Sequence, residues 1–313
     1  MNSMKEILKE WRKFTKSNLL TERTAPNQYY PRDYQTAEQN IVQKFKDHTW
    51  IFFDTETSGL DEKEPHVQIT QLAAIGYNTN AFETKPEEVE GARFNMKIAL
   101  QPETLTRKEQ EDSGEIPSDN YSISNLLSMT RYYDDPFQPK SPAEVAQAFT
   151  DFIMNVKNLS PTGNIVLIAH NADFDVLMLN ELYRRAGIVP PDATALDSLA
   201  FTDIYFKPVL EYINTNNLAD EEDERIASAI TLTNRRGKPY YASKLGNLVA
   251  GFEIEDKGWH EATADIAMSM DVLHKVIDYM RRKGVNHPQP LSGKGKMTYP
   301  FKRGGVGPFN KDQ

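Results

Sequence analysis

The feature of this sequence that most constrains its fold is the apolar run TWIFFDTE, residues 49–56, which ends in two carboxylates. Side chains of a β-strand alternate between two faces, so Trp50, Phe52, Asp54 and Glu56 should share one face. A carboxylate beside a hydrophobic core is costly unless a partner neutralises it. The run therefore predicts a buried strand whose acidic end is neutralised by other side chains or by a metal ion.

The order of the other apolar segments predicts an α/β fold. Strands expected at 49–56, 67–78 and 93–100 follow one another without a helix and should pair antiparallel. Later strands at 163–170 and 194–201 are reached through helices and should pair parallel. The helices are expected at 142–158, 172–186, 242–252 and 261–284. We therefore predict a mixed five-stranded sheet with helices on both faces.

The sequence divides into three parts. Residues 1–46 predict an N-terminal helical extension, 47–283 the α/β domain, and 284–313 a basic flexible tail. Residues 281–313 carry eight Lys or Arg and one acid in a chain of net charge −9, so this end either contacts an acidic partner or is a solvated tail. Two polar segments, 101–140 and 213–240, are interpreted as a variable region and a solvated insertion.

The composition excludes several classes of protein. The chain has no cysteine, which excludes disulfides, thiolate zinc sites and cysteine nucleophiles. No run of about 18 apolar residues is present, so no membrane contact is expected. The N-terminus is too polar for a signal peptide. The expected location is the cytoplasm, or the host cytoplasm for a viral protein.

Two further acidic residues share the position of Asp54 at the rim of the core. Asp175 and Asp265 each begin the apolar stripe of a predicted helix. A single such Asp is more often a helix cap or half of an ion pair. Four carboxylates close together would repel one another, and a divalent cation would relieve that repulsion. Oxygen ligands without thiols favour Mg²⁺ or Mn²⁺, and two such ions can hold the attacking and leaving oxygens of a phosphoryl displacement.

Three motifs carry a resemblance to a known family. The segments DTETSGL (54–60), HNADFD (170–175) and HEATAD (260–265) resemble the motifs of the DEDDh, or DnaQ-like, 3'-5' exonucleases, which include phage exonuclease A and bacterial exonuclease I. The subclass with a tyrosine would need Tyr where this chain has Glu261. The likeness spans 47–283 and implies an RNase H-like fold. All five defining positions are filled: Asp54, Glu56, Asp175, His260 and Asp265.

The resemblance implies a role for each of these residues. Asp54, Glu56 and Asp265 would hold the ion that activates water, Asp175 would support a second ion through water, and His260 would be the general base. Five other residues would bind the end of the substrate strand: Thr57, Leu60, His170, Asn171 and Phe174.

The expected function is a Mg²⁺- or Mn²⁺-dependent 3'-5' exonuclease that releases nucleoside 5'-monophosphates from single-stranded DNA. Two alternatives remain open: an RNA-trimming exoribonuclease, and a proofreading or accessory module that contacts a polymerase through the N-terminal extension. Aromatic residues in RYYDD (131–135) and PYY (239–241), together with Trp259, could stack on bases or pack in the core.

Overall fold

The computed structural model describes residues 45–61, 63–78, 84–117, 121–134, 138–256, 258, 261–283 and 298–301. The predicted N-terminal extension lies outside these residues except for its last two positions. Most of the predicted basic tail lies outside them as well. Among the described residues, no helix is long and apolar enough to cross a membrane.

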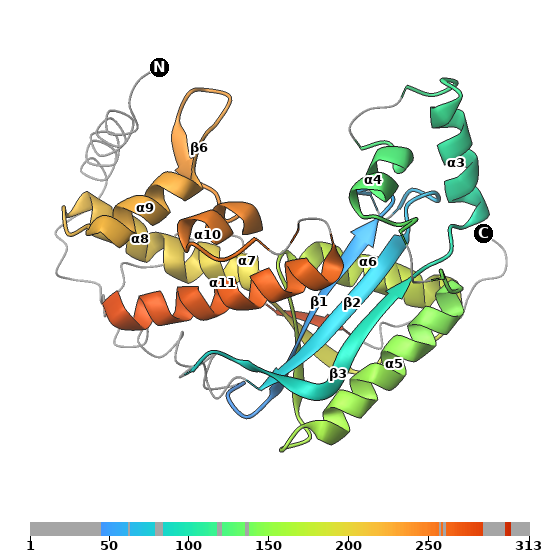
Figure 1. Ribbon diagram of the computed structural model, residues 1–313, viewed down its shortest axis with the longest axis horizontal. Helices are drawn as coiled ribbons and strands as arrows, with labels where there is room; N and C mark the ends of the chain where they lie inside the picture. The colour runs from blue at the N-terminus through green and yellow to red at the C-terminus, as the bar shows by residue number, and fades with distance from the viewer. Residues whose placement is uncertain are drawn as a thin grey trace.

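A mixed sheet forms the centre of the molecule, with strand order β3-β2-β1-β4-β5-β8 (Figure 1). β1 pairs antiparallel with β2, and β2 with β3, whereas β1, β4 and β5 run parallel. The predicted five-stranded mixed sheet is therefore confirmed. Its strands are β1 (Thr49–Thr57), β2 (Ile69–Asn78), β3 (Glu87–Lys97), β4 (Ile165–Ala169) and β5 (Ala193–Asp197).

The sixth strand was not predicted. β8 (Thr298–Phe301) pairs antiparallel with β5 at the sheet edge, inside the segment that the sequence assigned to the tail. Its signal is weak because the strand is short and contains Pro300, which lacks a backbone N–H. Proline is tolerated in an edge strand, where one side of the backbone has no neighbour.

Helices cover both faces of the sheet. α5 (Pro142–Leu159) and α6 (Ala172–Ala186) pack on one face, and α11 (Ala262–Lys283) crosses the other (Figure 1). Trp50 and Phe52 lie in the core under α11, whereas Ile51 and Phe53 lie in the core under α5 and α6. This alternation along β1 confirms that Asp54 and Glu56 continue the face covered by α11.

Local sequence signals fix the ends of the helices on the other face. α5 begins with the predicted capping box, in which the Ser141 side chain accepts from the Glu144 backbone and the Glu144 side chain accepts from Ser141. α6 ends at Gly187, whose φ of +66° is the left-handed conformation that glycine adopts readily.

The region 101–140 contains two helices, α3 (Pro102–Asp112) and α4 (Ile123–Met129). The turn after α4 is attached to β3 by the buried Lys97, whose Nζ donates to the carbonyls of Arg131 (2.6 Å), Tyr132 (2.8 Å) and Asp134 (2.9 Å). These long-range hydrogen bonds fix the position of the turn after α4, which the polar composition of the region did not predict.

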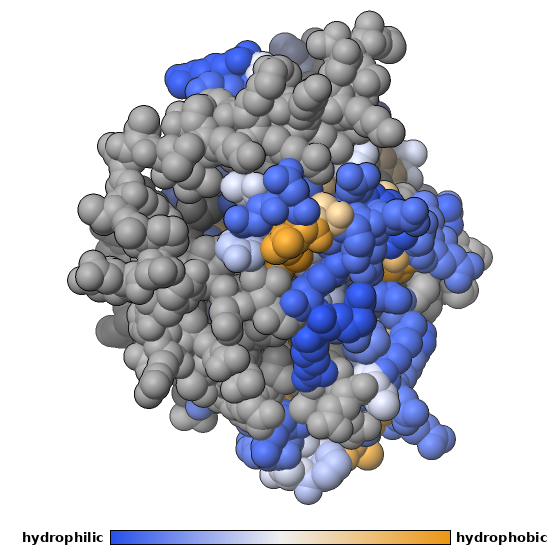
Figure 2. Space-filling view, turned by 90° about the vertical axis from the view of Figure 1, so that its left-hand side faces the viewer, coloured by the Kyte–Doolittle hydropathy of each residue, from blue (hydrophilic) through white to orange (hydrophobic). Residues whose placement is uncertain are grey.

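The region 213–240 is folded and is not the solvated insertion that the sequence predicted. It contributes to a second lobe, whose elements are α7 (Ser198–Phe201), the π-helical turn η2 (Thr202–Phe206), α8 (Lys207–Thr215), α9 (Glu221–Ile230), β6 (Thr231–Thr233), β7 (Pro239–Tyr241) and α10 (Leu245–Gly251). α9 buries Ile226 and Ile230 while its acidic residues cap its first turn. From the side of α8 and α9, the described surface is largely hydrophilic, with small hydrophobic patches, the clearest of them near the centre of the view (Figure 2).

Candidate active site

β1 and α11 bring three carboxylates together. The C-terminal half of β1 carries Asp54 and Glu56, and the first turn of α11 carries Asp265. One oxygen from each of the three lies within 4.8 Å of the others, and all three side chains are half-buried. α11 packs on β1 and β2, which explains how a residue some 200 positions away in the chain reaches the end of β1.

Asp175 lies beside this group but has a different environment. It is buried in the first turn of α6, and its Oδ1 accepts from the backbone N–H of Thr55 (3.1 Å) and from the Thr55 hydroxyl (2.7 Å). Thr55 points to the α6 face of β1 because it alternates with Asp54 and Glu56. Asp175 is thus tied to the same strand from the opposite side, and it is not one of the three clustered ligands.

The carboxylates perturb one another strongly. Burial raises the pKa of Asp54 well above its usual range, and the charges of Asp175 and Glu56 raise it further. Burial, then Asp265 and Asp175, raise the pKa of Glu56 to about 8. No ion pair joins Asp54 or Glu56 to another described residue.

The donor set fits a divalent metal ion. Three carboxylate oxygens from two rigid elements converge, and carboxylates are the ligands that Mg²⁺ and Mn²⁺ prefer. Bound cations would remove the mutual repulsion that raises the pKa of Asp54 and Glu56. Asp54, Glu56 and Asp265 would hold such an ion. Asp175 lies near enough to Asp54 for its charge to raise the pKa of Asp54.

A fifth acid, Glu261, was missed by the sequence analysis. Its charge also raises the pKa of Asp54 and Glu56. Its Oε2 accepts from the Ala264 backbone N–H (3.0 Å) and from the Thr263 hydroxyl, so it caps α11. Its Oε1 accepts from Gln71 Nε2 (3.3 Å) on β2. Glutamate is not a favoured cap residue, so the sequence gives only its position beside His260 as a signal.

Thr57 and Leu60 occupy the end of β1 and the loop after it. The pairing of β1 with β2 shifts between Glu56 and Thr57, a bulge that bends the strand end next to the carboxylates. The Thr57 hydroxyl donates to the Gly59 carbonyl (2.7 Å), which tightens this loop. Leu60 is 63% exposed, so its side chain is available for contact with a ligand.

The HNADFD segment places its predicted residues in three different settings. His170 is half-buried, with Nε2 2.8 Å from the Ser243 carbonyl and Nδ1 3.1 Å from the Ser198 hydroxyl. Asn171 is exposed, has a φ of +84°, and donates its backbone N–H to Asp197 Oδ1 (3.2 Å). Phe174 packs against the core under α5 and α6. His170 therefore joins two lobes of the chain, a role that its sequence did not reveal.

Two residues named from the sequence, His260 and Trp259, lie outside the described residues. The aromatic residues named from the sequence, which could either pack in the core or stack on bases, differ in their exposure. Tyr132 and Tyr241 are buried, whereas Tyr133 is 66% and Tyr240 is 44% exposed.

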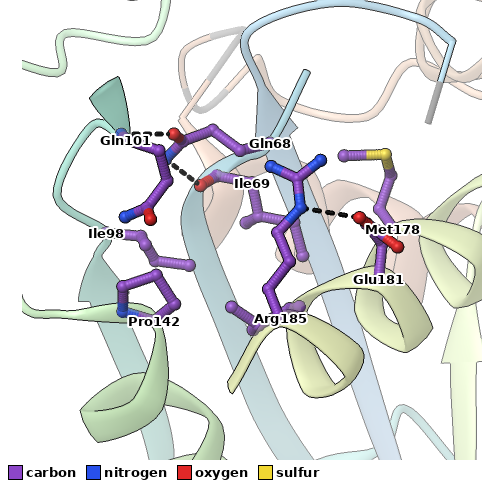
Figure 3. Close-up of a pocket in the computed structure, with 9 residues that line it drawn as sticks. Gln68, Ile69, Ile98, Gln101, Pro142, Met178, Glu181 and Arg185 are labelled. Carbon is purple, nitrogen blue, oxygen red and sulfur yellow. Dashed lines mark hydrogen bonds and ion pairs between the residues drawn. The ribbon is translucent and has the colours of Figure 1, made fainter. Parts of the chain in front are cut away.

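A separate small hollow lies on the α6 side of the sheet, near the start of β2 and the end of β3 (Figure 3). Its polar groups bond to each other: Gln101 N–H donates to Gln68 Oε1 (2.7 Å), and Arg185 Nε donates to Glu181 Oε1 (2.6 Å). It lies on the face opposite Asp54 and Glu56 and adds nothing to that cluster.

No protein-family model matches the chain. It is 22% identical over 273 residues to DNA polymerase III of PolC type from Staphylococcus epidermidis, and 22% over 285 residues to that of a Staphylococcus aureus strain. These matches cover 87% and 91% of this chain, but the chain spans only 14% of the length of either relative.

Two kinds of solved structure are also similar. Escherichia coli exonuclease I in complex with a dT13 oligonucleotide has a TM-score of 0.45 and 16% identity over 75% of this chain and 42% of that one. Cell-death related nuclease 4 has a TM-score of 0.41 and 11% identity over 74% of this chain and 64% of that one. The three motifs, the order of the central strands and the carboxylate cluster together confirm the resemblance of this chain to the DEDDh, or DnaQ-like, exonucleases of RNase H-like fold.

Proposed function

We propose that this protein is a metal-dependent 3'-5' exonuclease that hydrolyses single-stranded DNA to nucleoside 5'-monophosphates. The observation that carries the proposal is the convergence of Asp54, Glu56 and Asp265, whose oxygens lie within 4.8 Å of one another without a cation among the described side chains that pairs with Asp54 or Glu56. A cluster of carboxylates that repel one another is typical of a metal centre for phosphoryl transfer.

Each residue of the site has its own role in this proposal. Asp54, Glu56 and Asp265 bind the metal, and Thr55 fixes the orientation of Asp175 through two hydrogen bonds. When bound, a pair of Mg²⁺ or Mn²⁺ ions would supply positive charge for the attacking and leaving oxygens. His260, by the family resemblance, accepts the proton of the attacking water.

The substrate end is assigned to the loop after β1. Leu60 offers an exposed apolar surface to the terminal base, and the backbone around Thr57 is held by its hydroxyl bond to Gly59. The preference for DNA is supported by the sequence similarity to a DNA polymerase. A site that receives one strand end favours single strands, because each base pair that must be melted first costs roughly 1 to 2 kcal/mol.

A labelled-end assay tests this function directly. Oligonucleotides of DNA and RNA, labelled at either the 5' end or the 3' end, are incubated with the purified protein and Mg²⁺, Mn²⁺ or EDTA. We expect a descending ladder from the 3' end of DNA with either metal, and an intact oligonucleotide in EDTA. Full activity in excess EDTA, or shortening from the 5' end of a 3'-labelled strand, would contradict the proposal. Faster cleavage of RNA would favour the exoribonuclease alternative.

A second candidate function is proofreading in association with a polymerase. It is favoured by the match of this chain to a 14% segment of DNA polymerase III. Under this alternative, the isolated protein would be slow on plain single strands, and an added polymerase would increase the removal of a mismatched 3' nucleotide. Equal rates with and without polymerase would support an independent exonuclease.

A further inference from the structure

The tip of the β6–β7 hairpin is a basic and exposed element of the described structure. The sequence NRRGK, residues 234–238, places Arg235, Arg236 and Lys238 within four positions, and all three side chains are exposed. No ion pair joins Arg235 or Arg236 to another described residue. In a chain of net charge −9, this concentration of exposed positive charge is a local exception.

The backbone of this tip is well defined. Asn234 Oδ1 accepts from the backbone N–H groups of Arg236 (2.9 Å) and Lys238 (3.0 Å), and its own N–H donates to the Lys238 carbonyl (2.9 Å). Gly237 supplies the φ of +73° that the turn requires. The two arginines are therefore presented at the end of a two-stranded arm with a fixed turn.

The base of the hairpin is attached close to the carboxylate cluster. Ser243, two residues after β7, is hydrogen bonded through its carbonyl to His170 Nε2 (2.8 Å) and through its hydroxyl to Asp203. His170 follows β4, which pairs with β1 in the register Phe52 to Ile168. Asp54 and His170 each come two residues after this pair, so the hairpin base is joined to the edge of the sheet that carries Asp54.

The length of the hairpin arm follows from strand geometry. The five residue steps from Lys238 to Ser243 span about 17 Å at roughly 3.3 Å per step. The hairpin, together with α9 and α10, stands on one side of the end of β1, and α3 and α4 stand on the other side (Figure 1). A strand whose 3' end lies at the carboxylates would therefore meet the tip of such an arm several nucleotides before that end.

We infer that the β6–β7 hairpin is a binding site for the phosphate backbone of single-stranded nucleic acid, with Arg235 and Arg236 as the phosphate contacts. Exposed arginines without a carboxylate partner among the described residues suit this ligand, because a phosphodiester accepts their forked N–H groups. Tyr240, on β7 beside the tip and 44% exposed, offers a ring on which a base can stack. The inference rests on the proposed function for the direction of the strand, from the carboxylates outward to the tip.

The test is the salt dependence of binding. The affinity for a 5'-fluorescent oligo(dT) of about 20 nucleotides, longer than most single-fold binding sites, is measured by anisotropy in EDTA. Wild type is compared with the double variant Arg235→Ala/Arg236→Ala. Each phosphate contact contributes about 0.7 to the slope of log affinity against log salt, so the variant should have a slope lower by about 1.4. Between about 50 and 200 mM salt, wild type should therefore lose about sevenfold more affinity than the variant.

A matched control removes the same charge elsewhere. Lys157 on α5 and Lys275 on α11 are exposed, and Lys157→Ala/Lys275→Ala should keep the wild-type slope. Tyr240→Ala should weaken binding without changing the slope, because stacking releases no counterions. Equal slopes for the hairpin variant and this control would overturn the inference, and an unchanged affinity in Tyr240→Ala would overturn the stacking contact.

Hydrolysis of a trinucleotide separates this inference from the proposed function. A trinucleotide bound at the carboxylates does not reach the tip, so the hairpin variant should cleave it at the wild-type rate in Mg²⁺, which also verifies its fold. If wild type cleaves neither the trinucleotide nor the longer strand, the exonuclease proposal fails. A slope difference in that case would still support the hairpin as a nucleic-acid site.

Discussion

The two ends of α11 carry acidic clusters with opposite electrostatics. At its N-terminal end, Asp265 meets Asp54 and Glu56, and burial together with the charges of neighbouring acids raises the pKa of both Asp54 and Glu56. At its C-terminal end, the buried Asp223 accepts from Tyr279 Oη (2.7 Å) and Lys283 Nζ (2.9 Å), and Lys283 also donates to Asp220 (2.7 Å). The hydrogen bond from Lys283 helps to lower the pKa of Asp220 to about 2.

The difference lies in the partners that the chain supplies. The C-terminal cluster contains its own cation and is complete without a ligand, so its role is to hold α9 against α11. The N-terminal cluster places carboxylates together and leaves Asp54 and Glu56 without a described cation. A fold that accepts such repulsion at one end and avoids it at the other supports the proposal that the first cluster binds a cation.

The largest effect is expected when the N-terminal cluster is disrupted, and it is a loss of activity. Asp54→Asn removes a proposed metal ligand with little change of shape, and the exonuclease rate should fall by several orders of magnitude. The metal-free variant should be at least as stable as wild type, because one repelling charge has gone. Single-turnover cleavage of oligo(dT) and thermal unfolding in EDTA measure the two effects. A rate close to that of wild type would remove Asp54 from the metal centre.

At the other end of the helix, the expected effect is on stability. Lys283→Ala leaves the buried Asp223 without its cation, and loss of one partner of a buried ion pair costs about 3 kcal/mol or more. Denaturant unfolding should show this loss, while the rate of the folded enzyme stays near that of wild type. Lys275→Ala, an exposed lysine on the same helix, should change stability by less than about 0.5 kcal/mol.

The N-terminal cluster is visible in the sequence, because it depends on local periodicity. The alternation along β1 placed Asp54 on the face of Trp50 and Phe52, and both lie in the core under α11. The helical stripes placed Asp175 beside the buried Met178 and Leu179, as the structure confirms. Side-chain direction within one element needs no knowledge of its neighbours, which is why these residues could be predicted.

What the sequence could not show depends on tertiary contacts. The acidic run of α9 suggested solvent, because nothing local indicates that Lys283, sixty residues later, would neutralise Asp223. Glu261 caps α11 without a recognised signal, and Lys97 is held by carbonyls of a turn more than thirty residues away. His170 belongs to a motif, but its bond to Ser243 connects segments that no pattern relates.

A smaller effect concerns pH. The pKa of Glu56 is about 8 in the metal-free fold, whereas the ordinary value is 4.5. The folded state therefore binds the proton more tightly, and stability is lost as pH rises from about 4.5 to 8. In EDTA, wild type should lose a few kcal/mol more than Glu56→Gln over this window. Saturating Mg²⁺ should shrink the difference, and parallel profiles in EDTA would contradict the assignment.

The smallest expected effect has the opposite pH dependence, because stability is lost as pH falls. It tests the hydrogen bond between His170 and Ser243, which joins the two lobes. Burial lowers the pKa of His170 to about 4 from its usual 6.5, so the folded state favours the neutral ring. Its contribution is complete above pH 6.5 and is lost as pH falls toward 4, because the unfolded chain then binds the proton first.

The carboxylates titrate in an overlapping range, so the informative quantity is the difference between wild type and His170→Gln, whose amide can still donate to the Ser243 carbonyl. Between pH 7 and 5, wild type should lose on the order of 1 kcal/mol more than the variant. Denaturant unfolding at both pH values measures this difference, and Asn171→Ala, which changes an exposed neighbour but no titrating group, serves as the control. If His170→Gln and wild type respond equally to pH, the histidine is protonated as readily in the fold as in the unfolded chain, and its ring is not the buried neutral link between β4 and the base of the β6–β7 hairpin.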